Sequence, residues 1–258
     1  MALPTEHGGW GLTLEPAILG LLLAPSPAAL LLGLAAVLAF LVRTPLRLVV
    51  IGRRRGDQPR TATSQARTHL ATRVAAVELV GIVVAVVAVA TLAQDPSWWR
   101  PMAVALPLFV VALWFDFDLR SRHVAAEITG SLAIASVAAM GAVAGGATWS
   151  VAIAAWILLW ARILTSIPYV RAQIVRIHGR EPRSTPMLVG DTAALVTALA
   201  AFLVEPSLVL GSVAVLIVVG QQRLALSRPP HRAKVLGVRQ MALGFFVVGA
   251  TAVSSWLL

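Results

Sequence analysis

Two arginines near the end of a long apolar run, Arg43 and Arg47, have the type and spacing of an anion-binding pair. Residues four apart lie on the same face of a helix, and two guanidinium groups there can bind a phosphate or a carboxylate through paired hydrogen bonds. Pro45 stands between them, which predicts that the helix is kinked there or ends there. The alternative is that both side chains anchor a helix end in the lipid headgroups.

Ionisable residues within apolar runs form a second candidate set, because a charge inside the bilayer is costly and usually faces the protein interior or a wet cavity. Glu15, Glu78, Glu127, Arg162 and Asp191 occupy such positions. One interpretation is a structural ion pair between Arg162 and one of the carboxylates, with the others reaching toward the interface. Another is a charge relay of Glu15, Glu78 and Arg162 in a small transporter or channel. Most of the five lie toward one side of the membrane, which predicts a polar cavity open on that side.

Two polar segments add further candidates. Glu6 and His7 precede the first apolar run, and because an imidazole titrates near neutral pH, we expect this pair to close or protonate the mouth of the cavity. Asp116 and Asp118 lie in a short loop that mixes acids, bases and aromatics, a pattern typical of a self-neutralising interfacial segment. Neither segment has the ligand set of a metal site, so we predict no metal and no cofactor.

Composition places the chain in a membrane. Of its 258 residues, 59% are hydrophobic and 12% are charged, against about half and about a quarter in soluble proteins. The net charge of +10 comes from short basic clusters between apolar runs, which membrane topology explains, so we do not expect a nucleic acid partner. The sequence has no cysteine and no phosphate-loop, dinucleotide, zinc or serine-nucleophile motif. We expect one integral domain over residues 1–258, with the lipid bilayer as its surroundings.

Apolar runs long enough to cross a bilayer predict an all-α bundle of about nine transmembrane helices. Basic residues gather in every second connection, whereas the alternate connections contain Arg100 alone. The positive-inside rule therefore places the N-terminus in the cytoplasm and the C-terminus outside. The predicted spans cover residues 10–24, 28–51, 74–93, 102–115, 124–144, 149–170, 187–204, 207–220 and 235–258.

Three features resemble the bacterial YwiC-like family of integral membrane proteins. They are the opening Pro4-Thr5-Glu6-His7-Gly8-Gly9-Trp10, the stretch 16–20, and Arg43-Thr44-Pro45-Leu46-Arg47. Members typically begin with a proline, a charged residue and a His-Gly-Ala-Trp-like motif, and Gly9 stands here where alanine is commoner. The likeness extends to residues 118–130 and to Tyr169-Val170-Arg171 at the end of the sixth span. It implies a multi-pass protein of the bacterial inner membrane and no particular activity.

The layout of the spans also resembles the UbiA-type intramembrane prenyltransferases. That family has nine spans and binds prenyl diphosphate at the cytoplasmic ends of the second and sixth spans, through magnesium held by aspartate-rich motifs. This chain has Arg43 and Arg47 after the second span, and Tyr169 and Arg171 after the sixth. Arginines bind a diphosphate directly, whereas carboxylates need the Mg²⁺ ion. The resemblance therefore implies an isoprenoid or phospholipid phosphate ligand held without metal, and it leaves catalysis open.

The sequence thus predicts an arginine-rich pocket that opens to the cytoplasm and binds an anionic or isoprenoid-phosphate lipid, gripped by Arg43, Arg47 and Arg171. Two alternatives stay open: the transporter or channel described above, and an accessory protein for respiratory or membrane assembly whose loops are docking surfaces. The candidate ligand-binding residues are Arg43, Arg47, Arg162, Arg171, Tyr169, Glu6, His7, Asp116, Asp118 and Glu127.

Overall fold

A computed structural model describes residues 7–54, 62–117 and 123–258, and every regular element in these ranges is a helix. In chain order the elements are α1 (His7–Leu23), α2 (Pro27–Arg54), α3 (Ala62–Leu92), α4 (Arg100–Phe117), α5 (Val124–Ile134), α6 (Ser136–Ala144), α7 (Trp149–Ile177), α8 (Ser184–Val204), the 3₁₀ turn η1 (Pro206–Leu208), α9 (Val209–Leu226) and α10 (Ala233–Leu257).

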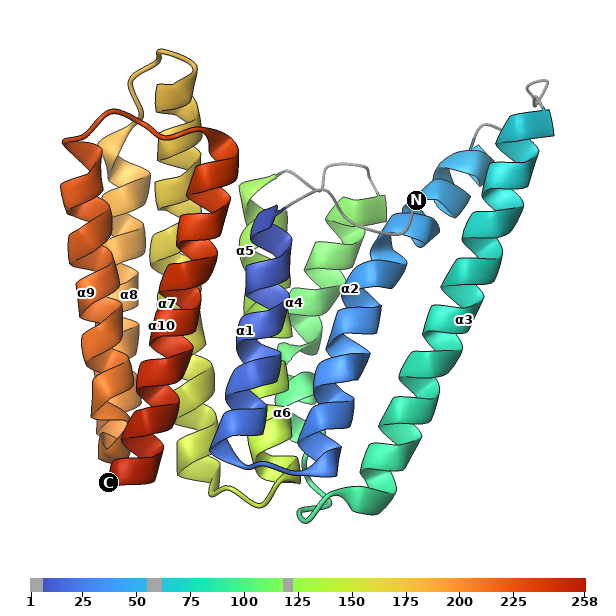
Figure 1. The fold of residues 1–258 in the computed structure, drawn as a ribbon, viewed down its shortest axis with the longest axis horizontal. Helices are drawn as coiled ribbons and strands as arrows, with labels where there is room; N and C mark the ends of the chain where they lie inside the picture. Colours follow the sequence, from blue (N-terminus) through green and yellow to red (C-terminus); the bar gives the residue numbers. More distant parts are fainter. Residues whose placement is uncertain (1–6, 55–61, 118–122) are drawn as a thin grey trace.

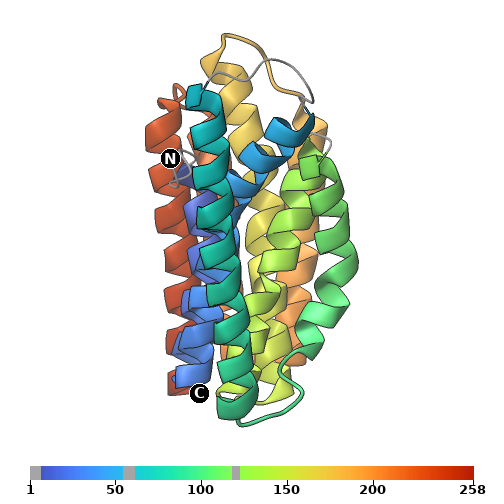
Figure 2. The ribbon, with the colours of Figure 1, turned by 90° about the vertical axis from the view of Figure 1, so that its right-hand side faces the viewer.

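The described helices cross the molecule nine times between two ends (Figure 1). α1 begins at one end and α10 finishes at the other, and α5 and α6 together make one crossing. Seven crossings are long and apolar enough to span a membrane, and the other two, Gly9–Leu23 and Arg100–Phe115, are shorter apolar helices. A view turned by 90° shows the crossings running along one common axis (Figure 2). The predicted all-α bundle is confirmed, and the chain is a multi-pass membrane protein.

Basic side chains gather at one end of this bundle, where α2 finishes and α10 begins; we call it the arginine-rich end. At the opposite end, proline, serine and glycine set the turns. The Ser26 hydroxyl accepts a hydrogen bond from the backbone N–H of Ala29 and so caps the start of α2. Between α6 and α7, Gly146 has a φ of +91°, which side-chain-bearing residues rarely adopt, and the Thr148 hydroxyl caps α7. The breaks at this end therefore fall where the sequence predicts them.

The helices run further than predicted at the arginine-rich end. The sequence predicts that the helix is kinked at Pro45 or ends there. α2 passes through Pro45 and continues to Arg54, so the predicted helix end is wrong. A proline inside a helix removes one backbone hydrogen bond, but the apolar residues that follow it still favour a helix in a bilayer, where every backbone group needs an internal partner. α7 likewise reaches Ile177, seven residues beyond the predicted 170. Arg43 and Arg47 consequently lie within α2 rather than at its end.

The bundle is made of two groups of helices, α1 to α6 and α7 to α10, which meet where α1 packs on α10 and α6 packs on α7 (Figure 1). Small residues allow close approach. A Cβ atom added to Gly20 of α1 would lie 2.9 Å from the carbonyl oxygen of Ala138 in α6, and one added to Gly190 of α8 would lie 2.6 Å from that of Leu164 in α7. The buried charges Glu15 and Arg162 lie at the boundary between the two groups.

Candidate functional site

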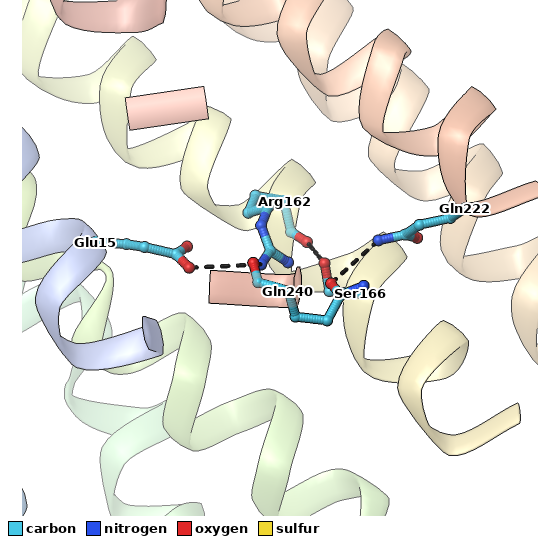
Figure 3. Close-up of polar contacts among 5 residues, drawn as sticks. All are labelled: Glu15, Arg162, Ser166, Gln222 and Gln240. Carbon is cyan, nitrogen blue, oxygen red and sulfur yellow. Dashed lines mark hydrogen bonds and ion pairs between the residues drawn. The ribbon is translucent and has the colours of Figure 1, made fainter. Parts of the chain in front are cut away.

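A buried ion pair joins the two groups of helices. Glu15 extends from α1 and Arg162 from the middle of α7, and their side chains are each 2% exposed (Figure 3). The carboxylate Oε1 lies 3.5 Å from Nη2 of the guanidinium. The carboxylate occupies the space beside Gly244 of α10, where no side chain would fit. A Cβ atom added to Gly244 would lie only 1.7 Å from Oε1. Removing either charge would leave the other uncompensated in a low-dielectric interior, so this pair fixes how α1, α7 and α10 fit together.

Arg162 uses only part of its hydrogen-bonding capacity within the described residues. Nη2 also donates to the backbone carbonyl oxygen of Gln240 on α10, at 2.5 Å. Nε and Nη1 are buried and have no hydrogen-bond partner among the described residues. Buried polar groups are satisfied in the great majority of proteins, so two unsatisfied N–H-bearing atoms on one buried guanidinium call for an explanation. In a guanidinium the Nε–H lies on the same edge as Nη2, so Nε and Nη1 donate along different edges, and each can bind an oxygen of an anion by itself.

A chain of polar side chains continues from this pair toward the arginine-rich end. The side chain of Gln240 lies 3.3 Å from that of Gln222 on α9, and the Gln222 oxygen lies 2.9 Å from the Thr165 hydroxyl of α7. The same hydroxyl lies 2.6 Å from an oxygen of Asp191 on α8, whose second oxygen is 2.5 Å from Nε of Arg223. The Thr165 hydroxyl has one proton and lies beside two acceptors, so the oxygens of Thr165, Asp191 and Gln222 share a single hydrogen.

The chain leads from the depth of the membrane to its surface. Arg162 is about 20 Å along α7 from Trp149, given a rise of about 1.5 Å per residue. Asp191 is about 10 Å inside the start of α8 by the same rise, and Arg223, in the last turn of α9, is 36% exposed. Four helices of the second group therefore provide a continuous polar path that starts at the arginine-rich end and stops at Glu15.

A second ion pair connects the two groups nearer the arginine-rich end. Nη1 of Arg171 on α7 lies 2.7 Å from a carboxylate oxygen of Glu127 on α5, and both side chains are more than a third exposed. Tyr169, two residues earlier, is buried, and its hydroxyl accepts a hydrogen bond from the Gln173 amide at 3.0 Å. Two of the predicted ligand-binding residues, Arg171 and Glu127, are thus in direct contact.

Arg43, Arg47 and Glu78 lie on α2 and α3, helices that take part in neither of these two ion pairs. Arg43 and Arg47 are exposed on α2, which packs on α1, α3, α4 and α6, whereas α7 with Arg171 packs mainly on α8 and α6. Glu78 is buried on α3, which packs mainly on α2, and its Oε2 has no partner among the described residues. Glu78 therefore belongs to the α2–α3 contact and is not part of the Glu15–Arg162 pair.

Four predicted site residues are only partly visible or lie outside the described residues. Glu6 and Asp118 lie outside the described ranges. His7 begins α1 and Asp116 is in the last turn of α4, but their side chains are not among those described. Within the described part of the chain, no group of three or more His, Cys, Asp or Glu residues could hold a metal ion. The roles predicted for these four residues stay predictions.

Comparison with known proteins gives one result. A family model described as YwiC-like protein matches residues 3–142, more than half of the chain. This chain belongs to the YwiC-like family. No curated protein and no solved structure matches it.

The YwiC-like match covers α1 to α5 and most of α6, including Glu15, Arg43, Arg47 and Glu127. It stops before α7, so the part of the predicted resemblance that rests on Tyr169-Val170-Arg171 stays a prediction. Each ion pair between the groups joins one residue inside the matched region to one beyond it: Glu15 to Arg162, and Glu127 to Arg171. The likeness to the UbiA-type fold is not among the matches found and also stays a prediction.

Hydrogen bonds tie the loops of this YwiC-like protein together at the opposite end. Asp95 accepts bonds from the Ser97 side chain and backbone and from the Trp149 indole, and these bonds, the Ser97 hydroxyl foremost, hold the pKa of Asp95 below its usual value. Glu205 accepts from Ser150 at 2.6 Å and from Ser207, which lowers the pKa of its carboxyl. Both carboxylates are stabilised in their charged form, so this end is held together at neutral pH.

The neutral members of the polar chain, Gln222, Gln240 and Thr165, were not predicted as site residues. The charged residues in the spans attract attention because each is costly in a membrane, whereas a single amide or hydroxyl in an apolar helix is unremarkable by itself. The available signal is that Gln222 and Gln240 lie on the last two spans, each about 6 to 10 Å from the helix end on the arginine-rich side.

Proposed function

We propose that this protein binds an anionic ligand inside its helical bundle, with Arg162 as the principal cation. The observation that supports the proposal is the pair of buried atoms, Nε and Nη1 of Arg162, that have no partner among the described residues. Each can donate a charge-assisted hydrogen bond to an oxygen of an anion such as a phosphate or a carboxylate. Arg162 is almost fully buried, so the ligand enters when α1 and α10 separate from α7.

The ligand reaches the site from the arginine-rich end, which the positive-inside rule assigns to the cytoplasm. Arginine and lysine side chains at that end attract anions before any direct contact. We propose that Arg43, Arg47 and Arg171 serve this attraction and that Arg171 exchanges its bond to Glu127 for one to the ligand. The ligand class that follows is a phosphate or diphosphate, carried by an isoprenoid or a phospholipid, and bound without a metal ion.

Binding is tested with the purified full-length protein in lipid nanodiscs. The probes are farnesyl diphosphate, a short-chain phosphatidic acid and inorganic diphosphate, each measured with Mg²⁺ and with a chelator. We expect farnesyl diphosphate to bind equally in both conditions. Binding of phosphatidic acid as well would indicate any lipid phosphate, and binding of inorganic diphosphate would indicate the anion alone.

The arginine requirement is tested by Arg162→Gln, which should weaken binding about a hundredfold because two charge-assisted hydrogen bonds are lost. Arg162→Lys keeps the charge but has one donor nitrogen in place of three, and should also bind weakly. Arg100→Gln, an exposed arginine at the opposite end, is the matched control and should bind normally. Equal affinity in Arg162→Gln and the wild type would refute the site, and no binding of any probe would refute the proposed function.

A transporter is the second candidate, and the position of the Glu15–Arg162 pair favours it. A charge pair halfway along α7, connected to one surface by a polar chain, is typical of substrate and proton pathways in membrane transporters. Proteoliposomes loaded with unlabelled farnesyl diphosphate should then accumulate labelled ligand from outside. Binding without accumulation would leave the protein as a lipid-phosphate binder, and failure of both assays would favour the accessory role.

A further inference from the structure

We infer that anion binding at Arg162 is coupled to the uptake of one proton by Glu15. The inference rests on the proposed function and adds to it a second ligand, the proton, and a second binding residue. Its basis is that Glu15 is the counter-ion of the cation that the anion would bind, and that neither side chain forms an ion pair with any other of the described residues.

The charges around Glu15 are few. Within the described residues its carboxylate forms an ion pair with Arg162 alone. The helices packed against α1 are α2, α5, α6, α7 and α10, and α6 carries no charged residue. Their other charged or titratable side chains with a described placement are Arg43, Arg47, Glu127, Tyr169, Arg171, Arg176, Lys234 and Arg239.

The charge balance then fixes the effect of a ligand. Without one, Glu15 and Arg162 sum to zero. An anion beside Arg162 would add its negative charge to that of Glu15 around one positive charge, in an interior of low dielectric constant where an uncompensated charge is costly. Protonation of Glu15 removes one negative charge from the site: a proton from solvent forms one O–H bond on the carboxyl group, and no bond of the ligand breaks. The anion and the proton therefore bind together.

The packing keeps Glu15 close to the site in both states. Its carboxyl group fills the space beside Gly244, and a Cβ atom at Gly11 of α1 would also lie within 3.3 Å of Oε1. The carboxyl group cannot withdraw to water without moving α1 from α10, so it responds to the anion by changing its protonation. The polar chain from Gln240 through Gln222 and Thr165 to Asp191 provides the route, because its amide, hydroxyl and carboxylate groups can hydrogen-bond the water that carries the proton inward.

The test is isothermal titration of the nanodisc protein with farnesyl diphosphate in buffers of different ionisation enthalpy. At pH 8 the ligand is fully ionised, since phosphate groups lose their last proton near about pH 6. We expect the wild type to take up about one proton per ligand and its affinity to fall about tenfold per pH unit as pH rises. Glu15→Gln should bind the ligand with no proton uptake and with an affinity that does not change with pH.

The matched control is Glu181→Gln, the same substitution at an exposed glutamate that has no part in the proposed site, which should retain the proton uptake. Wild-type binding without proton uptake would overturn the coupling and leave the proposed function standing. Proton uptake that persists in Glu15→Gln would assign it to another group and overturn the role of Glu15. If Glu15→Gln does not fold, Glu15→Asp replaces it: a shorter carboxylic acid should shift the pH at which affinity falls, and an unchanged profile would count against the inference. Absence of wild-type binding would remove the proposed function and the coupling with it.

Discussion

Glu15 and Arg162 are 147 positions apart in the chain, yet their side chains meet at 3.5 Å in the interior of the bundle. Neither helix could keep its charge in a membrane by itself, because an isolated charge at this depth costs at least about 3 kcal/mol. The pair therefore requires that the two groups of helices assemble together. It is the first place to look for both stability and function.

The first prediction concerns the coupling between these two side chains. Glu15→Gln and Arg162→Gln should each lower the stability of the purified protein by about 3 to 5 kcal/mol, because each leaves a buried charge without its partner. The double variant should be less destabilised than the sum of the two, since it leaves no charge. A double-mutant cycle by reversible unfolding in detergent measures this difference. Strict additivity would show that the two side chains do not interact.

The second prediction concerns Gly244. A methyl group there would collide with the Glu15 carboxylate, so Gly244→Ala should lower the unfolding temperature and weaken the contact of α1 with α10. Shortening the acid should relieve the collision, so Gly244→Ala in a Glu15→Ala background should cost much less. Gly249→Ala on the same helix is the control, because nothing lies within 4 Å of its added methyl group. Equal costs at the two glycines would contradict the observed position of Glu15.

The third prediction concerns the hydroxyl of Thr165, which connects Asp191 to Gln222. Thr165→Val keeps the shape but removes the hydrogen bonds, and should destabilise the protein by about 1 to 3 kcal/mol because buried acceptors lose a donor. It should also slow ligand-linked proton uptake, measured in a stopped-flow instrument with a pH indicator. Thr251→Val is the matched control, since Thr251 is equally buried but bonds only within α10. A proton uptake rate that Thr165→Val leaves unchanged would exclude this route.

The sequence predicts the all-α bundle and the helix limits at the end opposite the arginines because these depend on local properties: the length of apolar runs, and prolines and glycines such as Pro25 and Gly146 at the turns. It also identifies Arg162 as a charge that needs a carboxylate partner. It does not identify Glu15 as that partner, because Glu15, Glu78 and Glu127 are equivalent on a linear chain. Only the packing of α1 on α7 and α10 selects Glu15, while Glu78 faces α2 and Glu127 contacts Arg171.

The packing gives least support to the prediction that Arg43, Arg47 and Arg171 bind one anionic ligand together. Spacing along α2 correctly places the first two on one helix, but which helices adjoin α2 at the arginine-rich end is a matter of tertiary structure. α2 and α7 have different main neighbours, so a ligand held by all three arginines would have to extend across α1 and α5. The binding of farnesyl diphosphate by Arg43→Gln and Arg171→Gln, compared separately, tests this arrangement.

The last prediction concerns pH at the end opposite the arginines. Hydrogen bonds hold the pKa values of Asp95 and Glu205 below their usual values of about 4, so these groups bind protons less readily in the folded than in the unfolded protein. Their contribution to stability is therefore complete above about pH 4 to 5 and is lost as the pH falls through the lowered pKa values.

Thermal unfolding in detergent between pH 7 and pH 3 should show this loss, and the loss should be smaller in Ser150→Ala, which removes the shortest hydrogen bond to Glu205. Ser26 caps α2 at the same end and has no hydrogen bond to either carboxylate, so Ser26→Ala should lower the unfolding temperature by a similar amount at every pH. If the two variants had the same pH profile, the acid sensitivity would come from groups elsewhere. Because Asp95 and Glu205 lie outside the spans, whereas Glu15 lies between α1, α7 and α10, acid-induced loosening of this end and ligand-linked protonation of Glu15 should appear as separate events.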